Sequence, residues 1–471
     1  MRTDKIFKIM PVTIIHKYIY SLLIITLFAF AINCSGINGN NEPWMELFNG
    51  KDLAGWNQKG GNAKYTVDNG EIVGATVLNT QNSFLCTDEE YSDFILELEF
   101  IVDPVLNSGV QIRSHSYPEY SNFRVHGYQV EIDPSDRAWC GGIYDEARRG
   151  WLYPLKEDET AQKAFKQGEW NKFRVEAVGN HIKIWLNDVT TAHLVDDMTP
   201  RGFFGLQVHG IGNDKSKENI KVKWRNIRII TESPEKYQKE TDLPPTDMFN
   251  KLTSNEIDSG WKLLFDGKTT AGWRSAESDN FPEIGWEIDN GELTVLASGG
   301  SESANGGDII TLDKYSDFEL QVDFKITEVA NSGIKYFVLP ELNKGSGSAI
   351  GLEYQILDDE RHPDAKLGNH EGSRTLASLY DLIKAENKYP RQIGEWNHAR
   401  IISRNNNVEH WLNGRKVLEY KRGTEEYRQL VANSKYKIWK DFGEAIEGHI
   451  LLQDHGDRVS FRSIKIRVLS N

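Results

Sequence analysis

The segment Gly351–Asp359 reads GLEYQILDD, and it follows the run Asn331–Phe337, which reads NSGIKYF. A matching pair lies earlier in the chain, where Gly127–Asp133 reads GYQVEID and Asn107–Arg113 reads NSGVQIR. Within each pair, apolar and polar residues alternate, which predicts β-strands with one face in a core. The other face carries carboxylate and amide groups side by side. We therefore expect these strands to form the floor of a site.

Alternation also assigns the polar side chains to faces. In the later copy, Glu353 and Gln355 share the face opposite Tyr354 and Ile356. In the earlier copy, the shared polar face is predicted to carry Gln129, Glu131 and Asp133.

The pairing continues along the chain and indicates a duplication. FNGKDLAGW at Phe48–Trp56 recurs as FDGKTTAGW at Phe265–Trp273, and the motifs GEWN and WLN also occur in both copies. The repeat predicts one domain at 44–231 and a second at 259–469, joined by a polar, proline-containing linker at 232–258. The second copy carries an insertion around 423–448, in which EEYRQLVANSKY has the spacing of a short helix.

Elsewhere, short alternating runs are separated by Asn-Gly and Gly-Asn turns, with no long amphipathic helix and no β-α-β rhythm. This pattern is typical of all-β proteins. At 471 residues the chain suits two or three domains. We predict two tandem antiparallel β-sandwiches of jelly-roll type, each with a concave sheet on which polar side chains meet a ligand.

Composition excludes several classes of function. The formal net charge of −14 and the pI near 5.4 argue against nucleic-acid binding, which needs a basic face. The sequence has no GxSxG elbow, P-loop, HExxH motif or Rossmann glycine fingerprint, so serine hydrolases, nucleotide enzymes and zincins are set aside. Cys86 and Cys140 are too few for a disulfide framework.

The N-terminus has the pattern of an export signal. Four basic residues precede the apolar run 18–32, and Asn33 and Cys34 follow it. The pattern predicts a signal peptide at 1–34 that ends in a lipid-acceptor cysteine, Cys34, with an uncleaved membrane anchor as the alternative. Either way, we expect an exported periplasmic or outer-membrane lipoprotein whose membrane contact is limited to this anchor.

Taken in order, the motifs F(N/D)GK…GW, NSG, G(L/Y)(E/Q)(Y/V)(Q/E), SLYDL or GGIYDE, GEWN, WLN and (V/D)HG resemble the 3-keto-disaccharide hydrolase domain, once in each copy. The resemblance implies a concanavalin-A-like sandwich and an enzyme that cleaves glycosides oxidised to a ketone at sugar C3. The implied reaction removes the C2 proton, eliminates the C1 substituent to give a 2-hydroxyglucal, and then hydrates that product. Because a C3 ketone acidifies the C2 proton, such a site needs a base, a donor for the enolate and an acid for the leaving group.

In the second copy the resemblance carries over most directly to Glu353, Gln355, Tyr380 and His455, which lie within the motifs. Our hypothesis is that Glu353 or His455 is the C2 base and that Tyr380 is the leaving-group acid or the enolate donor. Alternatively, His455 is a turn residue bonded to backbone, and Tyr380 is a packing ring. The further candidates for substrate binding in this copy are Asp358, His362, His410 and Asp454.

The first copy differs at important positions, since Gln129 stands in place of Glu353 and Glu131 in place of Gln355. Acid–base groups remain, and the catalytic candidates here are Glu131, Tyr144 and His209. We expect both copies to be active, and the alternative is that the first copy has become a binding module. The candidates for substrate binding in this copy are Arg113 and Gln129.

Two other functions fit parts of the pattern. Glu131 and Asp133 together suit a retaining glycosidase that acts on unoxidised sugars, and two lectin-like modules suit a non-catalytic carbohydrate-binding protein. The partner expected in every case is a carbohydrate. No organic cofactor is expected, while Glu353, Asp358 and His362 form a set that suits a divalent cation.

Overall fold

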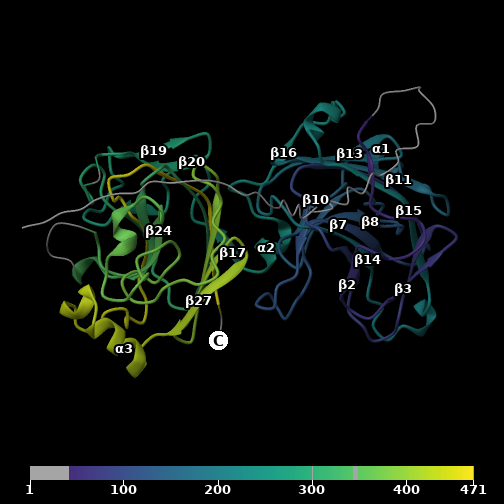
Figure 1. Ribbon diagram of the computed structural model, residues 1–471. Helices are drawn as coiled ribbons and strands as arrows, with labels where there is room; N and C mark the ends of the chain where they lie inside the picture. Colours follow the sequence, from purple (N-terminus) through teal and green to yellow (C-terminus); the bar gives the residue numbers. More distant parts are fainter. Residues whose placement is uncertain (1–41, 300, 343–347, 470–471) are drawn as a thin grey trace, which may run out of the picture. The chain divides into compact units, whose positions relative to one another are not determined.

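The computed structural model describes residues 42–299, 301–342 and 348–469 (Figure 1). Strands dominate these residues, and the predicted all-β class is confirmed. The predicted signal peptide at 1–34 and its Cys34 lie outside the described residues. Across the described ranges, no helix has both the length and the apolar character needed to span a membrane.

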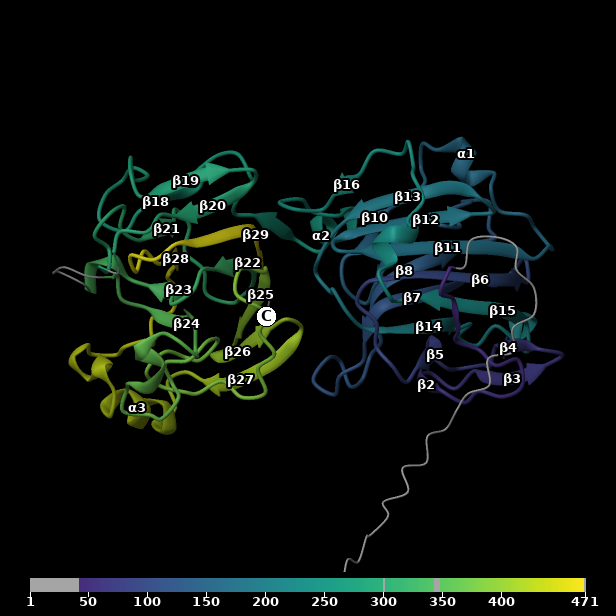
Figure 2. The same ribbon diagram turned by 45° about the horizontal axis from the view of Figure 1, so that its top comes forward.

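The first half of the chain forms two sheets that pack face to face, and their strands are labelled in Figure 2. The described residues place nine strands in the larger sheet, which in spatial order are β16 (Thr246–Asp247), β13 (Val189–Val195), β12 (His181–Leu186), β11 (Asn171–Val178), β6 (Phe94–Val102), β15 (Lys221–Ile230), β4 (Glu71–Ala75) and β3 (Lys64–Asp68), with β1 (Met45–Glu46) paired to β15. The second sheet has seven described strands, namely β10 (Gly150–Tyr153), β9 (Ile143–Glu146), β8 (His126–Ile132), β7 (Ser108–His115), β14 (Phe203–Val208), β5 (Ser83–Thr87) and β2 (Trp56–Gly60).

The second half repeats this arrangement with fewer strands. One sheet has eight strands among the described residues, namely β19 (Trp286–Asp289), β20 (Glu292–Val295), β29 (Val459–Val468), β22 (Phe318–Ile326), β25 (Asn397–Arg404), β26 (Asn407–Leu412) and β27 (Arg415–Lys421), with β17 (Trp261–Leu263) paired to β29. The facing sheet has five in the same ranges, namely β18 (Trp273–Ser275), β21 (Ile309–Thr311), β28 (His449–Leu452), β23 (Asn331–Val338) and β24 (Leu352–Leu357).

Each half has its own apolar core between its two sheets. In the first half, the rings of Phe94 on β6 and Phe204 on β14 meet edge to face with centroids 4.7 Å apart. In the second half, Phe318 on β22 and Tyr336 on β23 have centroids 6.2 Å apart. Fully burying one such side chain contributes about 1.5–3 kcal/mol, so these inward faces dominate the stability of each sandwich. The predicted pair of tandem jelly-roll sandwiches is confirmed.

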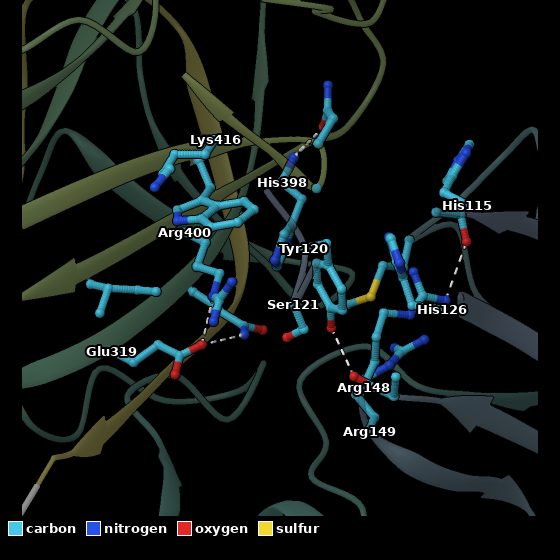
Figure 3. A pocket seen from close by; sticks show the side chains of 18 of the residues that line it. His115, Tyr120, Ser121, His126, Arg148, Arg149, Glu319, His398, Arg400 and Lys416 are labelled. Carbon is cyan, nitrogen blue, oxygen red and sulfur yellow. Dashed lines mark hydrogen bonds and ion pairs between the residues drawn. The ribbon is translucent and has the colours of Figure 1, made fainter. Parts of the chain in front are cut away.

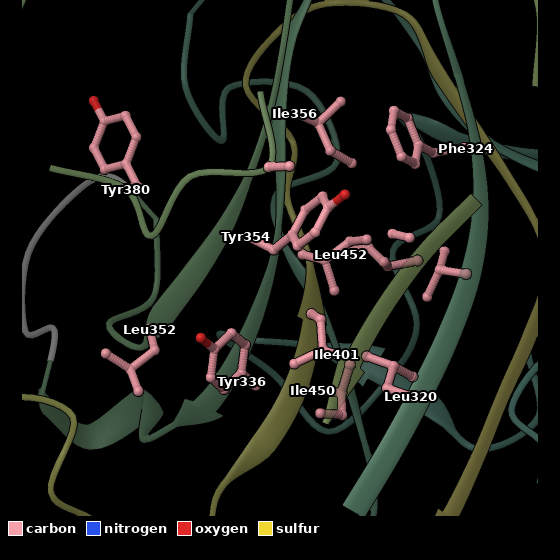
Figure 4. Packing of buried hydrophobic residues seen from close by; sticks show 14 of the residues in the cluster. Leu320, Phe324, Tyr336, Leu352, Tyr354, Ile356, Tyr380, Ile401, Ile450 and Leu452 are labelled. Carbon is pink, nitrogen blue, oxygen red and sulfur yellow. The ribbon is translucent and has the colours of Figure 1, made fainter. Parts of the chain in front are cut away.

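The predicted alternation of the floor strands is also present. Tyr354 and Ile356 on β24 belong to the core, and Figure 4 shows them among its side chains. Tyr380 belongs to the same cluster, and Figure 4 shows it at the margin with its hydroxyl directed away from the other side chains. Glu353 and Gln355 occupy the other face of β24, yet they are almost fully buried because further chain segments cover them.

The insertion predicted in the second copy contains the expected helix, α3 (Glu425–Ala432). Its N-cap is Thr424, whose side chain accepts a hydrogen bond from the Tyr427 backbone N–H at 3.2 Å. Tyr427 is buried and donates its hydroxyl proton to the Phe442 carbonyl at 2.8 Å. These contacts fix the next turn, η5 (Lys435–Ile438), close to the covered face of β24.

The stretch predicted as a linker, 232–258, contains local structure. Strand β16 adds to β13 in parallel, and α2 (Ser254–Asp258) begins with a capping box formed by Thr253 and Glu256. The domain boundaries 44–231 and 259–469 stay predictions. The remaining short helices are α1 (Glu159–Gln162), η1 (Lys215–Lys217), η2 (Pro234–Tyr237), η3 (Pro340–Leu342) and η4 (Pro363–Lys366).

Candidate active site

The floor of each candidate site is made by the same three strands. In the first half β7 pairs with β8 and β14, and in the second half β23 pairs with β24 and β28. Gly109 lies opposite Glu131 in the first register, and Gly333 lies opposite Gln355 in the second. The structure therefore equates Gln129 with Glu353 and Glu131 with Gln355, as the sequence comparison does.

In the first half, a cavity of about 330 Å³ opens over this floor. It gathers four predicted residues, Gln129, Glu131, Tyr144 and His209, from three different strands and loops. The other side chains that line it are Asn82, Asn107, Arg124, Arg137, Glu146, Trp151 and Gln207.

Glu131 is the central ionisable group of this cavity, and its side chain is 4% exposed. Asn107 donates to its Oε1 at 2.6 Å, and Gln129 donates to its Oε2 at 2.8 Å. Burial raises the pKa of Glu131 to about 7, although these two amides and Arg137, 3.5 Å away, oppose the rise. A carboxyl group with this pKa exchanges its proton readily near neutral pH, which is what a general base or acid requires.

His209 and Tyr144 supply two further groups to the same cavity. His209 donates from Nδ1 to the Gly210 carbonyl at 2.8 Å, a tautomer assigned from this contact, and Nε2 is left as an acceptor. Burial lowers the pKa of His209, so the neutral ring is favoured. Burial, with Glu146 and Glu131 nearby, raises the pKa of Tyr144 and keeps its hydroxyl protonated. The first half thus offers an acceptor and a donor on either side of one carboxylate.

Arg137 is the cation nearest to Glu131, and it is held by aromatic rings. Its guanidinium lies 4.8 Å from the ring centroids of both Trp139 and Trp151, and its Nε donates to Asp133 Oδ2 at 2.7 Å. Cation–π contacts of this kind stabilise a positive charge at a fixed place. The sequence showed this residue only as part of an Arg- and Trp-rich segment.

In the second half the carboxylate has a different neighbourhood. Lys335 on β23 lies 3.8 Å from Glu353 Oε2, and both side chains are buried. Lys335 also donates to the Ser348 hydroxyl, which in turn donates to the Asp308 carboxylate. Burial raises the pKa of Glu353, and Lys335 followed by Lys435 opposes part of that rise. In the first half the equivalent residues are two neutral amides, and Gln111 donates to Gln129 at 2.6 Å.

Two other catalytic candidates of the second half, His455 and Tyr380, lie close enough to Glu353 to interact with it electrostatically. His455 Nε2 is 3.3 Å from Asn331 Nδ2, and its Nδ1 has no hydrogen-bond partner. Tyr380 donates its hydroxyl proton to Asp364 at 2.8 Å, and Lys435 Nζ lies 4.3 Å from the centroid of its ring. Burial raises the pKa of Tyr380, and the neighbouring Glu353 and Asp364 raise it further. Tyr380 is therefore a donor at neutral pH.

Two pairs of residues shared by both halves were missed as candidates. Asn107 and Asn331 take equivalent places at the start of the central floor strand, where Asn107 bonds to Glu131 and Asn331 contacts Gln355 and His455. Gln207 and Gln453 lie at equivalent places near the end of the neighbouring floor strand, β14 or β28. Both side-chain polar atoms of Gln207, and Oε1 of Gln453, are buried without a hydrogen-bond partner. Unpaired amides beside a cavity are costly unless a ligand completes them. Each of these positions is polar in both copies, and that was the signal in the sequence.

Four predicted substrate-binding residues do not reach either site. Arg113 stands at a β-bulge with φ of +45°, so alternation fails there and the guanidinium turns inward to Asp93 and the Ala177 and Gly179 carbonyls. His410 is fully buried on β26 between the Tyr336 hydroxyl and the Ala377 carbonyl.

The other two are structural carboxylates. Asp454 accepts the backbone N–H groups of Gly306 and Gly307, and it is fully buried. Asp358 accepts the Val329 N–H at 2.9 Å and pairs with Arg361. His362 lies near the second site, with its ring centroid 6.4 Å from that of His455, and it caps η4 by accepting the Asp364 N–H at 3.1 Å.

Among the residues that the structure describes, no three His, Cys, Asp or Glu side chains are grouped as a metal site. The predicted set Glu353, Asp358 and His362 is not assembled, because Asp358 is saturated by backbone N–H groups and Arg361. We derive no chemical step through a cation.

A separate cavity of about 500 Å³ contains none of the predicted residues (Figure 3). Its charged groups pair with one another, as Arg400 does with Glu319 at 2.6 Å, and Tyr120 stacks on His126 with centroids 3.8 Å apart. This cavity lacks an unpaired ionisable group around which a reaction could be organised.

Comparison with known proteins gives the family. The model of the 3-keto-alpha-glucoside-1,2-lyase-like domain matches residues 43–230 and again 260–467. A 3-keto-disaccharide hydrolase of Bacteroides thetaiotaomicron is 38% identical over 230 residues, which are 45% of this chain and 79% of that protein. The crystal structure of a candidate glycosyl hydrolase from Parabacteroides distasonis is 29% identical with a TM-score of 0.42, covering 47% of this chain and 100% of that one. The carbohydrate-binding module CBM66 from Bacillus subtilis is 17% identical with a TM-score of 0.24, covering 37% and 93%. With two matches that span most of its length, the chain belongs to the 3-keto-alpha-glucoside-1,2-lyase-like domain family.

Proposed function

We propose that this chain cleaves glycosides whose sugar carries a ketone at C3, by proton removal at C2, elimination of the C1 substituent and hydration of the resulting 2-hydroxyglucal. Family membership and the 3-keto-disaccharide hydrolase activity named for the Bacteroides relative support the substrate class. The observation that carries the proposal is Glu131, a buried carboxyl group with a pKa near 7 in a cavity it shares with Tyr144 and His209.

The reaction uses these groups as follows. Glu131 accepts the C2 proton, and the electron pair of that C–H bond enters the enolate of the C3 ketone. The enolate then forms the C1–C2 double bond as the C1–O bond breaks, and the leaving oxygen takes a proton from Tyr144. Arg137 and the unpaired amide of Gln207 are placed to stabilise the enolate oxygen. In the hydration, the water oxygen bonds to C1, Glu131 returns its proton to C2, and the proton released by the water restores Tyr144.

The second half fits the same scheme with a different base environment. Glu353 is the C2 base, and Lys335 beside it favours the ionised form. Tyr380 is protonated and suits the acid role. His455, with a buried and unpaired Nδ1, suits a contact to the substrate. Of the two bases considered from the sequence, Glu353 is preferred because it is the more deeply buried and has the closer cation.

A retaining glycosidase built on Glu131 and Asp133 is less well supported. Such an enzyme needs a carboxylate free to attack C1. Asp133 accepts hydrogen bonds from Ser135 and Arg137, and although burial acts in the opposite direction, these contacts lower its pKa. Its oxygens are occupied in holding the loop that carries Arg137.

The test is turnover of a 3-keto-glucoside and of the matching unoxidised glucoside by the purified chain, with release of the leaving group and of 2-hydroxyglucal both measured. Glu131→Gln, Glu353→Gln and the double variant are compared with Glu157→Gln, an exposed glutamate, as the matched control. We expect turnover of the ketone only, loss in the double variant and no change in the control. Full activity in the double variant would end the carboxylate assignment, and activity on the unoxidised sugar would favour a glycosidase. Sugar binding without turnover would favour a lectin.

We also propose that the chain is exported and lipid-anchored at Cys34, on the strength of its leader sequence. Metabolic labelling with a fatty acid tests this directly. Cys34→Ala should lose the label and leave the membrane fraction, and retention of the label would refute the assignment.

A further inference from the structure

The cavity over Glu131 continues on one side into a second one. A space of about 710 Å³ adjoins it and shares Asn107, Arg137 and His209 with it as common walls. The added wall combines the apolar residues Pro104, Val105, Leu106, Pro134 and Ile211 with Asp133, Ser135, Asp214 and Lys217. Val105 is half exposed, so its side chain is accessible from this space.

On its other side, the cavity over Glu131 continues into a space of about 340 Å³ that shares Asn82, Arg124 and Glu146 with it. The added wall combines the polar side chains of Thr80 and Gln81 and glycine backbone with Phe84 and Val125. The first half therefore has a groove with Glu131 between its two ends, and apolar side chains are more numerous at the end of Val105 and Ile211 than at the end of Thr80 and Gln81. These are called its apolar end and its polar end.

The duplication provides an internal comparison for the apolar end. Because Asn107 and Asn331 are equivalent, Pro104 corresponds to Glu328 and Val105 to Val329. Because His209 and His455 are equivalent, Ile211 corresponds to Asp457. Two apolar residues of the first half are thus acidic in the second.

The acidic residues of the second half lie at its site. Asp457 accepts the backbone N–H of Asn331 at 3.0 Å, directly beside the floor strand. It is also close enough to His362 to act on that ring electrostatically, as are Asp358 and His455. Glu328 is exposed at the adjoining turn. The end that is apolar in the first half is a cluster of carboxylates and histidines in the second.

We propose that the two halves select different leaving groups: the first takes 3-keto-glycosides of an apolar, aromatic-type alcohol, and the second takes those whose leaving group is another sugar. This rests on the proposed function. A sugar ring carries hydroxyl groups that must be hydrogen-bonded when they leave water, so the 3-keto ring occupies the polar part of the first groove. The C1 substituent then extends toward Val105 and Ile211, where it loses water without needing donors or acceptors. In the second half, carboxylates at that place accept the hydroxyl protons of a second sugar.

The experiment uses the full chain with two substrates, a phenyl 3-keto-glucoside and a 3-keto-disaccharide. The chain is tested as wild type and with either Glu131→Gln or Glu353→Gln, so that one half at a time is silenced. We expect Glu131→Gln to lower kcat/KM for the phenyl substrate at least tenfold and for the disaccharide less than about twofold, with the reverse for Glu353→Gln.

A second set of variants tests the wall itself in the chain that carries Glu353→Gln. Val105→Asp, at an exposed position, should lower kcat/KM for the phenyl substrate about tenfold. The matched control is Val329→Asp, at the equivalent place in the silenced half, which should leave that value unchanged.

The outcomes separate the two levels of the proposal. If the wild type turns over neither substrate, the proposed function fails and this inference fails with it. Suppose that the wild type is active but each of Glu131→Gln and Glu353→Gln lowers kcat/KM for both substrates in the same proportion, or that one of these variants loses activity on both substrates. The proposed function then stands, and the division of leaving groups between the halves is overturned. An unchanged Val105→Asp variant also overturns it.

Discussion

Replacing Glu131 by glutamine should make the chain more stable at alkaline pH while it silences the first half. Glu131 is nearly inaccessible to water, and burial raises its pKa from an ordinary value of 4.5 to about 7. Between these two values the folded protein binds a proton that the unfolded chain has already released. The stability contributed by the protonated form is therefore complete below pH 4.5, and it is lost as the pH rises to about 7.

The magnitude follows from the pKa. Each unit of pKa corresponds to about 1.4 kcal/mol, so ionisation of Glu131 in the folded state costs on the order of 3 kcal/mol. Glutamine resembles the neutral acid and cannot ionise, so the variant escapes this loss. The difference in unfolding free energy between variant and wild type should thus be about 3 kcal/mol larger at pH 8 than at pH 4.5. For a domain of this size, such a change corresponds to on the order of 6 to 12 °C in Tm.

The assay is thermal or urea unfolding of both proteins at the two pH values, with Glu157→Gln as the surface control. Groups that titrate in both proteins cancel in the difference. The activity of the first half, measured in the Glu353→Gln chain, should rise with pH through about 7, because a base acts only when it is deprotonated. A stability difference that is the same at pH 4.5 and pH 8 would show that Glu131 ionises as it does in water, and our choice of it as the base would be wrong.

Three further predictions concern neighbouring residues. Lys335→Met should lower the free energy of unfolding in urea by about 3–5 kcal/mol, because it leaves Glu353 buried without its cation. Adding Glu353→Gln should restore most of this loss. No restoration would argue against the ion pair. Gly333→Ala should lower the activity of the second half at least tenfold, since a Cβ there would lie 2.4 Å from the Glu353 carboxylate. This activity is measured in the Glu131→Gln chain. An unaffected rate would mean that this position of Glu353 is not the reactive one. Tyr144→Phe should lower kcat of the first half about a hundredfold with little change in Tm, whereas an unchanged kcat would identify Tyr144 as a packing ring.

Much of the fold could be predicted because the alternation of apolar and polar residues recurs at matching places in the two copies. The alternation in Leu352–Leu357 placed Tyr354 and Ile356 in the core and Glu353 and Gln355 opposite, as the structure does. Because of the duplication, a strand predicted in one copy was supported by the matching pattern in the other. The helix α3 was visible because the insertion had no counterpart in the first copy and had the spacing of a helix. Local patterns were sufficient for these elements because each buries one face.

Alternation failed where the backbone departs from a regular strand. Arg113 was a candidate for substrate binding, but the bulge at this residue turns its side chain toward the first sheet, where four acceptor atoms hold it. Phe337 adopts a similar positive φ, +53°, at the equivalent bulge. A single sequence does not reveal a bulge, since one extra residue leaves the composition of the strand unchanged.

The second copy contained the information needed to avoid these errors. His410 corresponds to Ile184, Asp454 to Val208 and Arg113 to Phe337, and each apolar partner is buried. In these three pairs the polar residue occupies a core position, where other buried groups satisfy it. By contrast, Asn107 and Asn331, and likewise Gln207 and Gln453, are polar in both copies and lie at the sites.

The same comparison explains why the sites differ while the sandwiches agree. Most core positions keep an apolar side chain in both halves, because a packed interior tolerates little change in volume. Floor positions face a ligand, and there the neutral pair of Gln111 and Gln129 in one half has become the ion pair of Lys335 and Glu353 in the other. The carboxylate that the first half keeps at Glu131 is displaced by two residues along the strand, about 7 Å. That distance exceeds the width of a sugar ring, so one binding pose cannot present the same C–H bond to both carboxylates, and each half must orient its substrate in its own way.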